Sequence, residues 1–432
     1  MGDAPVVTPG SVPAGATSPR GIPLPRNEWD RLDGVEPLEA PRVSVVVAHY
    51  EQQAQLDRTL LALRRQDHPA SRLEIIVVDD GSVRPPRVPG DVRLIRQEDR
   101  GFRLAAARNA GLEAASGDVV CFLDADTAPE RSYVRELTRL PALASDVVTV
   151  GRRRHAELGR LEPSAELSSE APAVALPDPA WLTDAYARSR DLRDADDRSY
   201  RFVIGAVIAA DAGLLRETGG FDETFSAYGG EDWEWAYRAW LRGALLAHVP
   251  AATAWHDGPE WAGRPEAALA RKNAEAQRLA DLIPVPGSAG RGRPGRFADV
   301  VVSVPAGAGQ EAAPWFVTLD SVAAELPLAA LPGDERSIER SRIRVEARRP
   351  FRTSPGALRA AVERVSREGL GALVVVDPAD GSVLCVIHSR RAEARAARWG
   401  RSDLFDSVAE AVPGVRGVGG DVDVEAYLGG WG

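Results

Sequence analysis

Two β-branched runs decide the fold class of this sequence, Val43-Ser44-Val45-Val46-Val47 and Leu73-Glu74-Ile75-Ile76-Val77-Val78. Continuous apolar runs of this length are typical of strands that are covered on both faces in a parallel sheet. Four leucines at near-helical spacing lie between the runs: Leu56, Leu60, Leu61 and Leu63. The stretch therefore predicts a strand, helix, strand unit at the start of an α/β domain.

The same alternation continues towards residue 260. The pattern predicts further strands and helices, with strands at 92–95, 119–123, 146–150 and 202–210 and helices at 103–115, 130–140 and 231–242. A polar, proline-rich stretch at 152–199 interrupts the alternation, and we interpret it as an insertion or lid beside a functional site. A second stretch, at 283–296, is rich in Pro, Gly and Arg and predicts a linker.

We expect three parts in the chain. Residues 1–41 are rich in Pro, Gly, Ala and Thr and predict a flexible N-terminal arm, of which the later part could dock on the first domain. Residues 42–285 form the first α/β domain, and residues 297–432 form a second, smaller α/β domain. The valine run that opens the second domain resembles the first strand of the chain, so a degenerate repeat is an alternative.

Composition excludes several function classes. The chain has 432 residues, enough for two or three domains, and 63 acidic against 53 basic side chains, which disfavours general nucleic-acid binding. Lys272 is the one lysine, so a P-loop or a lysine Schiff base has almost no candidate. Cys121 and Cys385 lie in apolar runs and predict buried reduced thiols. No run of about 18 apolar residues occurs, and we expect a soluble cytoplasmic protein without transmembrane segments.

Acidic clusters follow two of the predicted strands. Asp124-Ala125-Asp126 ends one strand, and Asp79-Asp80-Gly81-Ser82 ends another. Ligands of open α/β sheets bind beyond the carboxyl ends of the strands, so both clusters fall on the same functional edge. Carboxylate oxygens are hard ligands that suit Mg²⁺ or Mn²⁺. Taken alone, each cluster is as well explained by an ordinary solvated turn.

Six blocks of this sequence, taken in order, resemble the family 2 glycosyltransferases of the GT-A fold, which implies a Rossmann-like mixed sheet flanked by helices. The resemblance covers residues 42–260. The blocks are Val-Val-Val-Ala-His-Tyr at 45–50, Ile-Val-Val-Asp-Asp-Gly-Ser at 76–82, Gly-Phe-Arg-Leu-Ala-Ala-Ala-Arg-Asn-Ala-Gly at 101–111, Gly-Asp-Val-Val-Cys-Phe-Leu-Asp-Ala-Asp at 117–126, Gly-Gly-Phe-Asp-Glu at 219–223 and Gly-Gly-Glu-Asp-Trp-Glu at 229–234. The last block is also similar to that of galactosyl- and N-acetylgalactosaminyl-type enzymes and of bacterial chondroitin-type polymerases.

The resemblance implies a UDP-sugar donor and a bound Mn²⁺ or Mg²⁺. Asp126 is then a metal ligand at the diphosphate, with His256 as a further ligand or a structural residue and Asp257 as an alternative ligand. The other donor-binding residues that it implies are Ala48, Tyr50, Asp79, Asp80, Arg108 and Asp124. Arg108 has two further interpretations: it braces the Asp-Ala-Asp loop, or it only snorkels from its helix into solvent.

The same resemblance assigns the reaction at the acceptor. Asp232 is the catalytic base, with helix capping as the competing role, and Glu231 beside it binds a hydroxyl. Of Trp233 and Trp235, one is an acceptor platform and the other belongs to the core. Arg152, Arg153 and Arg154 form either a patch for an anionic acceptor or a solvated charged face.

We therefore expect a metal-dependent, inverting glycosyltransferase that moves a sugar from a UDP-sugar to a hydroxyl of a glycan, glycolipid, natural product or peptide. A non-catalytic scaffold that binds nucleotide sugars or glycans is the alternative, and a nucleotidyltransferase is a third hypothesis. A homodimer is left open.

The sequence departs from the family pattern at two points. His49-Tyr50-Glu51 replaces the usual Tyr-Asn, and Gln-x-x-Arg-Trp, the motif of processive membrane synthases, is absent, which argues against a cellulose- or hyaluronan-synthase-like role.

Overall fold

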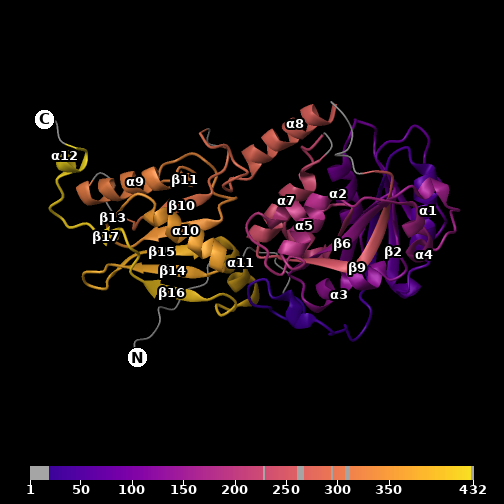
Figure 1. Ribbon diagram of the computed structural model, residues 1–432, viewed down its shortest axis with the longest axis horizontal. Helices are drawn as coiled ribbons and strands as arrows, with labels where there is room; N and C mark the ends of the chain where they lie inside the picture. Colours follow the sequence, from indigo (N-terminus) through magenta and orange to yellow (C-terminus); the bar gives the residue numbers. More distant parts are fainter. Residues whose placement is uncertain (1–18, 227–228, 260–266, 293–294, 307–311, 430–432) are drawn as a thin grey trace. The chain divides into compact units, whose positions relative to one another are not determined.

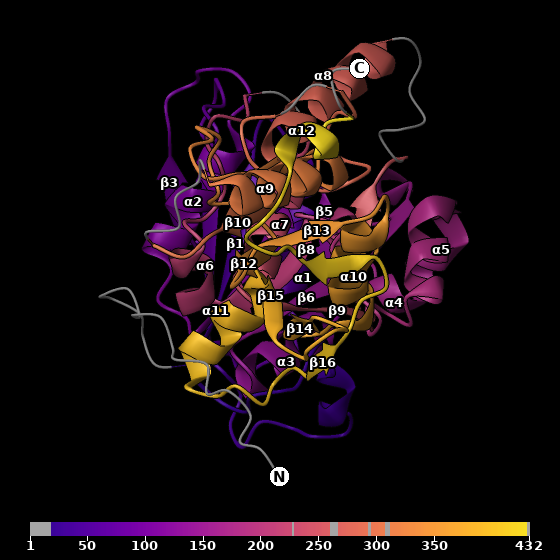
Figure 2. The ribbon, with the colours of Figure 1, turned by 90° about the vertical axis from the view of Figure 1, so that its left-hand side faces the viewer.

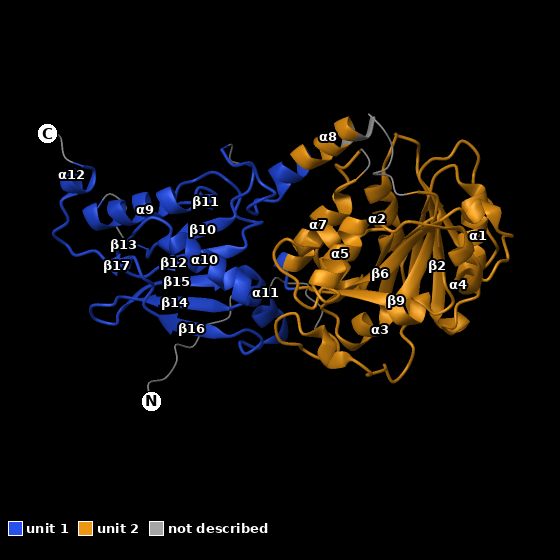
Figure 3. Ribbon diagram, viewed as in Figure 1, with its two compact units in different colours: residues 1–14, 241–243, 278–432 blue, residues 15–240, 244–277 orange. Residues whose placement is uncertain are grey.

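The protein is described by a computed structural model that covers residues 19–226, 229–259, 267–292, 295–306 and 312–429. Its internal contacts divide it into two compact units (Figure 3). The unit that comes first along the chain, here called the first unit, holds residues 15–240 and 244–277 (orange, 'unit 2' in the key of Figure 3), and most of the second unit is residues 278–432 (blue, 'unit 1' in that key). The division therefore falls inside helix α8 (Ala267–Leu282), before the linker that the sequence predicts at 283–296. The last turn of α8 belongs to the second unit, and the carbonyl of Leu282 accepts a hydrogen bond there from Arg340 Nη1 (3.3 Å).

The first unit is built on one large mixed sheet (Figures 1 and 2). Among the described residues its main strand order is β3-β2-β1-β4-β8-β6-β9-β5, with β7 paired to β6. Strands β3, β2, β1 and β4 run parallel, β8 is antiparallel to β4 and β6, and β5 is antiparallel to β9. The bounds are β1 Val43–His49, β2 Leu73–Asp79, β3 Arg93–Arg96, β4 Val119–Asp124, β5 Thr127–Pro129, β6 Val147–Ala156, β7 Ala175–Leu176, β8 Val207–Asp211 and β9 Leu245–Asp257. The predicted α/β class with a mixed sheet is confirmed.

Helices flank this sheet, and four of them, at 53–64, 104–114, 133–143 and 231–241, lie close to where the sequence pattern places them. Their bounds are α1 Gln53–Arg64, α2 Leu104–Ala114, α3 Tyr133–Leu143, α4 Leu167–Glu170, α5 Ala180–Arg188, α6 Ala212–Glu217 and α7 Glu231–Leu241. The predicted face of α1 is buried through Leu56, Leu60 and Leu63. Helix α2 comes so close to β1 that a Cβ on Gly111 would lie 2.2 Å from the Val46 side chain, which explains a glycine in mid-helix.

Strand register brings the acidic clusters together. Ala48 on β1 pairs with Asp124 on β4, and His49 on β1 pairs with Asp79 on β2. Because these three strands are parallel and in register, their carboxyl ends meet at one edge of the sheet. The side chains that follow them are therefore neighbours in space, as the sequence predicts.

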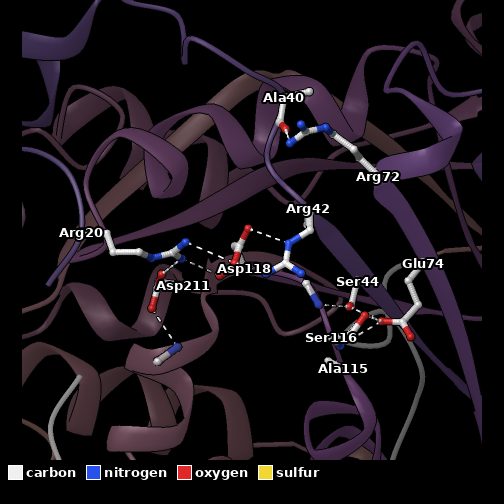
Figure 4. A network of polar contacts seen from close by, with 12 residues as sticks. Arg20, Ala40, Arg42, Ser44, Arg72, Glu74, Ala115, Ser116, Asp118 and Asp211 are labelled. Atoms are coloured by element: carbon white, nitrogen blue, oxygen red, sulfur yellow. Dashed lines mark hydrogen bonds and ion pairs between the residues drawn. The ribbon is translucent and has the colours of Figure 1, made fainter. Parts of the chain in front are cut away.

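The segment from residue 19 to residue 41 is packed on the first unit. Arg20 binds Asp118 and Asp211, and Arg42 binds Asp118 (Nη2 to Oδ1 2.9 Å), as Figure 4 shows. Leu24 and Leu32, each 3% exposed, join a core cluster with Leu140. The packed part thus begins at residue 19 and extends beyond the later part that the sequence analysis expected to dock, because its few apolar side chains contact the surface of the unit and its charged side chains have partners. Residues 1–18 lie outside the described residues.

The second unit has its own sheet and core (Figure 1). Among the described residues its sheet has the strand order β11-β10-β12-β15-β14-β16, and β13 pairs with β17. The bounds are β10 Val300–Ser303, β11 Ala329–Ala330, β12 Ile343–Ala347, β13 Phe351–Thr353, β14 Ala372–Val376, β15 Val383–Ser389, β16 Ser407–Glu410 and β17 Val415–Gly417, with helices α9 Ala313–Glu325, α10 Ala357–Glu368, α11 Arg390–Trp399 and α12 Val424–Tyr427. This is the second α/β unit that the sequence predicts. Both cysteines are buried and free, also as predicted.

Candidate active site

A pocket of about 470 Å³ opens at the carboxyl ends of the first-unit strands. Eight residues that the sequence analysis selects contribute to its wall: Ala48, Tyr50, Asp80, Asp124, Asp126, Arg153, His256 and Asp257. These residues come from segments more than 200 positions apart in the chain and from five strands or the turns after them. The pocket is therefore the candidate active site.

Asp126 and His256 face each other across the pocket. The antiparallel pairing of β5 with β9 sets His256 opposite Thr127, the residue after Asp126. His256 Nε2 lies 3.6 Å from Asp126 Oδ2. His256 Nδ1 lies 3.2 Å from the carbonyl oxygen of Gly258, which can only accept, so Nδ1 carries a proton and Nε2 is the ring nitrogen that faces Asp126.

This pair has the chemistry of a small cation site. A carboxylate and a neutral imidazole are both ligands for Mn²⁺, and Mg²⁺ is commonly held by one or two carboxylates together with substrate phosphates. Burial raises the pKa of Asp126, and His256 opposes that rise. Within the described part of the chain no three His, Cys, Asp or Glu side chains converge on a common point, so a cation here would need oxygen ligands from the substrate as well.

Asp257 is engaged elsewhere. Its Oδ1 accepts a hydrogen bond from the backbone N of Gly159 (3.3 Å), and Gln55 Nε2 lies 3.5 Å from its Oδ2. Gln52, which the sequence analysis did not select, donates instead to Asp126 Oδ2 (3.1 Å). Asp257 is thus less suited to the alternative ligand role than His256.

Asp79 and Asp80 have different surroundings. Asp79 is fully buried and accepts hydrogen bonds from Ser82, from His49 Nδ1 (2.9 Å) and from Arg96 Nε (2.9 Å). Burial alone raises the pKa of Asp79, but these hydrogen bonds outweigh it and hold that pKa below its usual value. Both carboxylate oxygens of Asp79 thus accept hydrogen bonds from the protein itself, and Asp79 is not among the residues that line the pocket.

Asp80 remains part of the pocket wall. Its Oδ2 accepts from the backbone N of Arg103 (2.8 Å), and Gln97 also donates to it. Burial raises the pKa of Asp80. Tyr50, 47% exposed, stands at the mouth of the same pocket.

Arg108 binds two of the predicted site residues at once. It is 2% exposed, and its Nη1 donates to Glu231 Oε1 (2.8 Å) while its Nη2 donates to Asp124 Oδ1 (3.1 Å). Of the three interpretations of Arg108, the geometry favours the one in which it braces the Asp-Ala-Asp loop. It also links that loop to the start of α7.

Glu231 accepts a hydrogen bond from Arg108, and Asp232 is the next residue in the chain. Neither is among the described residues that line the pocket. Burial first, and the neighbouring Asp232 second, raise the pKa of Glu231 to about 7 against the opposing effect of Arg108. Glu231 Oε2 is buried and has no hydrogen-bond partner among the described residues. Asp232 is half-buried, and its carboxylate accepts from the backbone N of Gly205 and of Trp233 (2.8 Å each). Burial raises its pKa as well.

The arginine triplet separates into two roles. Arg153 lines the pocket, whereas Arg152 and Arg154 both lie within 4 Å of Asp178. The alternation of β6 explains the split, because neighbouring side chains of a strand point to opposite faces. Of the two tryptophans, Trp235 is fully buried and belongs to the core, while half-buried Trp233 packs against Trp181 (centroids 6.4 Å apart).

One protein family matches part of the first unit. The model of glycosyl transferase family 2 matches residues 44–184. This segment belongs to that family. The family 2 segment carries Asp79, Asp80, Asp124 and Asp126, whereas Glu231, Asp232 and His256 lie beyond it.

Curated relatives agree with the family 2 assignment. The chain is 30% identical over 246 residues to a hyaluronan synthase of Pasteurella multocida, which covers 50% of this chain and 24% of the relative. It is 32% identical over 222 residues to a validoxylamine A glucosyltransferase of Streptomyces hygroscopicus subsp. limoneus, which covers 47% of this chain and 49% of the relative. The chain thus spans about a quarter and about half of these two proteins.

The first of these relatives bears on an expectation from the sequence. A missing Gln-x-x-Arg-Trp motif argues against a hyaluronan-synthase-like role, yet this chain is similar to a protein of that name. In the described part of the chain no helix is long and apolar enough to cross a membrane.

Solved structures with a similar fold include a mannosyltransferase of Pyrobaculum calidifontis in complex with GDP-Man and Mn²⁺, at a TM-score of 0.39 and 20% identity over 58% of this chain and 66% of that chain. GalNAc-T7 with UDP, GalNAc and Mn²⁺ has the same TM-score and 22% identity over 51% of this chain and 44% of that one. The first unit, which contains the family 2 segment, has a mixed sheet and flanking helices. This is the GT-A fold that the resemblance implies.

Proposed function

We propose that this protein transfers a hexose-type sugar from a UDP-sugar to a hydroxyl group of an acceptor, with a divalent cation and with inversion at the anomeric carbon. The observation that carries the proposal is the pocket in which Asp80 and Asp126 of the family 2 segment meet His256, which follows that segment in the chain. A chain that had kept only the fold would have no need for a carboxylate oxygen and an imidazole nitrogen 3.6 Å apart in this pocket.

The donor lies along the edge of the sheet in this proposal. Asp80 and Tyr50 contact the uridine, since both line the pocket on the side of β1 and β2. Asp126 and His256 hold the cation, Mn²⁺ or Mg²⁺, beside the diphosphate. When bound, such a cation neutralises the charge that grows on a leaving diphosphate. Arg108 keeps Asp124 fixed, so that the Oδ2 of that carboxylate is left to accept from a sugar hydroxyl.

The acceptor reacts through Asp232. Its carboxylate takes the proton of the acceptor hydroxyl while the hydroxyl oxygen forms a bond to the anomeric carbon, and the bond from that carbon to the diphosphate oxygen breaks. Two backbone amides hold the carboxylate in place. Arg108 and its partner Glu231 lie next to it, and the protonated form of Glu231 can donate to a hydroxyl oxygen near neutral pH.

The names of the relatives support two kinds of acceptor. Hyaluronan and chondroitin synthases are named for glycan products, and validoxylamine A glucosyltransferase is named for a small-molecule acceptor. We propose a glycan or a hydroxylated natural product as the acceptor here, with glycolipids and peptides as further classes to test.

The test is release of UDP from a panel of UDP-sugars with Mn²⁺, with and without a chelator. Slow hydrolysis of the donor reports on the site without an acceptor. The variants are Asp126→Ala and Asp232→Asn, and the matched control is Asp184→Asn, an exposed carboxylate on α5. Loss of several kcal/mol of charge stabilisation predicts a drop of roughly 100-fold or more for Asp126→Ala.

The outcomes separate the proposal from its alternative. Metal-dependent hydrolysis of one sugar, lost in both site variants and kept in the control, supports the enzyme and names the donor. Tight binding of UDP-sugars with no turnover, even with acceptors added, would favour the non-catalytic scaffold. No binding of any UDP-sugar would overturn the donor assignment.

A further inference from the structure

One charged side chain of the pocket has no role in the proposed function, that of Arg153 on β6. Among the described residues that line the pocket, Arg153 is the one with a permanent positive charge. Four carboxylates line the same pocket, namely Asp80, Asp124, Asp126 and Asp257. The neighbours of Arg153 in the arginine triplet, Arg152 and Arg154, are not among the lining residues.

The pairing of β6 with β9 fixes the face on which Arg153 lies. The two strands are parallel neighbours in the sheet, and Arg153 stands opposite Ala254 (Figure 1). Two positions further along both strands, His155 stands opposite His256. Opposite residues of paired strands lie on the same face of a sheet, and so do residues two positions apart in one strand. Arg153 and His256 are therefore diagonal neighbours on the face that lines the pocket.

Arg154 has the opposite orientation. It stands opposite Trp255, and its guanidinium carbon lies 4.3 Å from the centre of that ring. Trp255 is fully buried and belongs to a core cluster with Ala128 and Leu167. The core thus takes up the Arg154 face of these strands, and the guanidinium group of Arg153 is left on the pocket side.

The charge of Arg153 acts on the proposed cation site. Burial is the main cause that raises the pKa of Asp126, and Arg153 is among the positive charges that oppose this rise. Burial lowers the pKa of His155 to about 3, and Arg153 is the second cause. The ring of His155 lies 5.2 Å from that of His256, centre to centre. These effects agree with the strand register, which sets Arg153 beside the two proposed cation ligands.

A guanidinium group in this position suits an anion. It has hydrogen-bond donors and no acceptor, so it cannot be a ligand of the cation itself. Its planar fork of N–H groups matches the oxygens of a phosphate or a carboxylate. A UDP-sugar carries such oxygens on its diphosphate, and an acidic UDP-sugar carries them on the sugar as well.

We propose that Arg153 binds an anionic oxygen of the nucleotide-sugar donor, on the diphosphate or on an acidic sugar. The inference rests on the proposed function, because it needs a UDP-sugar in the pocket. It assigns Arg153 to the donor and not to an anionic acceptor. It also separates Arg153 from Arg152 and Arg154, which lie next to Asp178.

The experiment is calorimetric titration of the full chain with UDP, UDP-glucose and UDP-glucuronate, in the presence of Mn²⁺ and without an acceptor. The variant Arg153→Gln removes the charge, and Arg153→Lys keeps the charge but not the fork. Arg152→Gln is the matched control, because it makes the same change one residue earlier at an exposed side chain beside Asp178. The melting temperature of each variant shows whether a loss of affinity is local.

We expect Arg152→Gln to bind UDP as tightly as the wild type does. Arg153→Gln should bind it roughly 10- to 100-fold more weakly, the usual effect of losing a hydrogen bond between charged groups. Arg153→Lys should lose less affinity, because its charge remains. A loss for all three probes assigns the contact to the diphosphate, whereas a loss for UDP-glucuronate alone assigns it to the sugar carboxylate.

Three results would overturn the inference. If the wild type and Arg153→Gln bind all three probes equally well, Arg153 does not contact the donor, and the proposed function stands without it. An equal loss in Arg152→Gln would show that net charge acts on the donor and that no direct contact exists. If the wild type binds none of the probes, the proposed function fails, and the donor contact fails with it.

Discussion

Replacing Glu231 by Gln tests the electrostatics of the buried cluster most sharply. The pKa of Glu231 is raised from 4.5 to about 7, by burial first and by Asp232 second. Between these two pH values the folded protein therefore holds a proton that the unfolded chain releases. The stability that this group contributes is fully present below pH 4.5 and is lost as the pH rises through 7. At 1.36 kcal/mol for each pKa unit, the loss is about 3 kcal/mol.

The variant Glu231→Gln keeps an acceptor for Arg108 but has no proton to lose. Its free energy of unfolding, relative to that of the wild type, should rise by about 3 kcal/mol between pH 4.5 and pH 8. Urea unfolding followed by tryptophan fluorescence at several pH values measures this difference. Glu113→Gln, an exposed position on α2, is the matched control and should track the wild type. A constant difference between Glu231→Gln and the wild type across this range would refute the raised pKa and the burial argument behind it.

Three more substitutions probe the same unit. Arg108→Met should lower the free energy of unfolding by about 3–5 kcal/mol, because it leaves two carboxylates without their buried partner, and an effect below about 1 kcal/mol in urea unfolding would contradict this. Asp211→Ala should cost about 1–2 kcal/mol, since Asp211 caps α6 through the backbone N of Gly213 and binds Arg20, whereas an unchanged melting temperature would show that neither contact matters. His256→Ala should weaken activation by Mn²⁺ by roughly 10- to 100-fold in a metal titration of UDP release, and an unchanged Mn²⁺ response would remove His256 from the cation site.

Local sequence patterns predicted the parts of the site that one strand carries. The valine runs predicted β1 and β2, and the acidic residues after β2 and β4 were expected at one edge because parallel strands share their direction. The register of Ala48 with Asp124 and of His49 with Asp79 confirms that expectation. No longer-range information is needed for this step.

The rest depends on contacts that no local pattern encodes. The meeting of Asp126 with His256 requires the antiparallel pairing of β5 with β9, two strands far apart in the chain. The difference between Asp79 and Asp80 arises from Arg96, Ser82 and His49, which saturate one carboxylate and not the other. Adjacent residues of the same type have the same local signal, so their roles separate only when the neighbours are known.

The resemblance also reached only part of the chain. It places Arg108 in the block at 101–111 but leaves open whether the side chain approaches the donor, braces the loop or snorkels from its helix, and only the two carboxylate contacts favour the bracing role. It says nothing about the second unit, for which the sequence predicts an α/β unit and no site residues.

The most direct test of the account is calorimetric titration of the protein with UDP in the presence and in the absence of Mn²⁺. We expect one UDP site whose affinity falls by roughly 100-fold when Mn²⁺ is left out, because the diphosphate and Asp126 would share the cation. In Asp126→Ala the affinity for UDP should be equally weak in the presence and in the absence of Mn²⁺. Equal UDP affinity with and without Mn²⁺, or no UDP binding under either condition, would contradict the claim that the pocket at the strand ends is a metal-assisted nucleotide-sugar site.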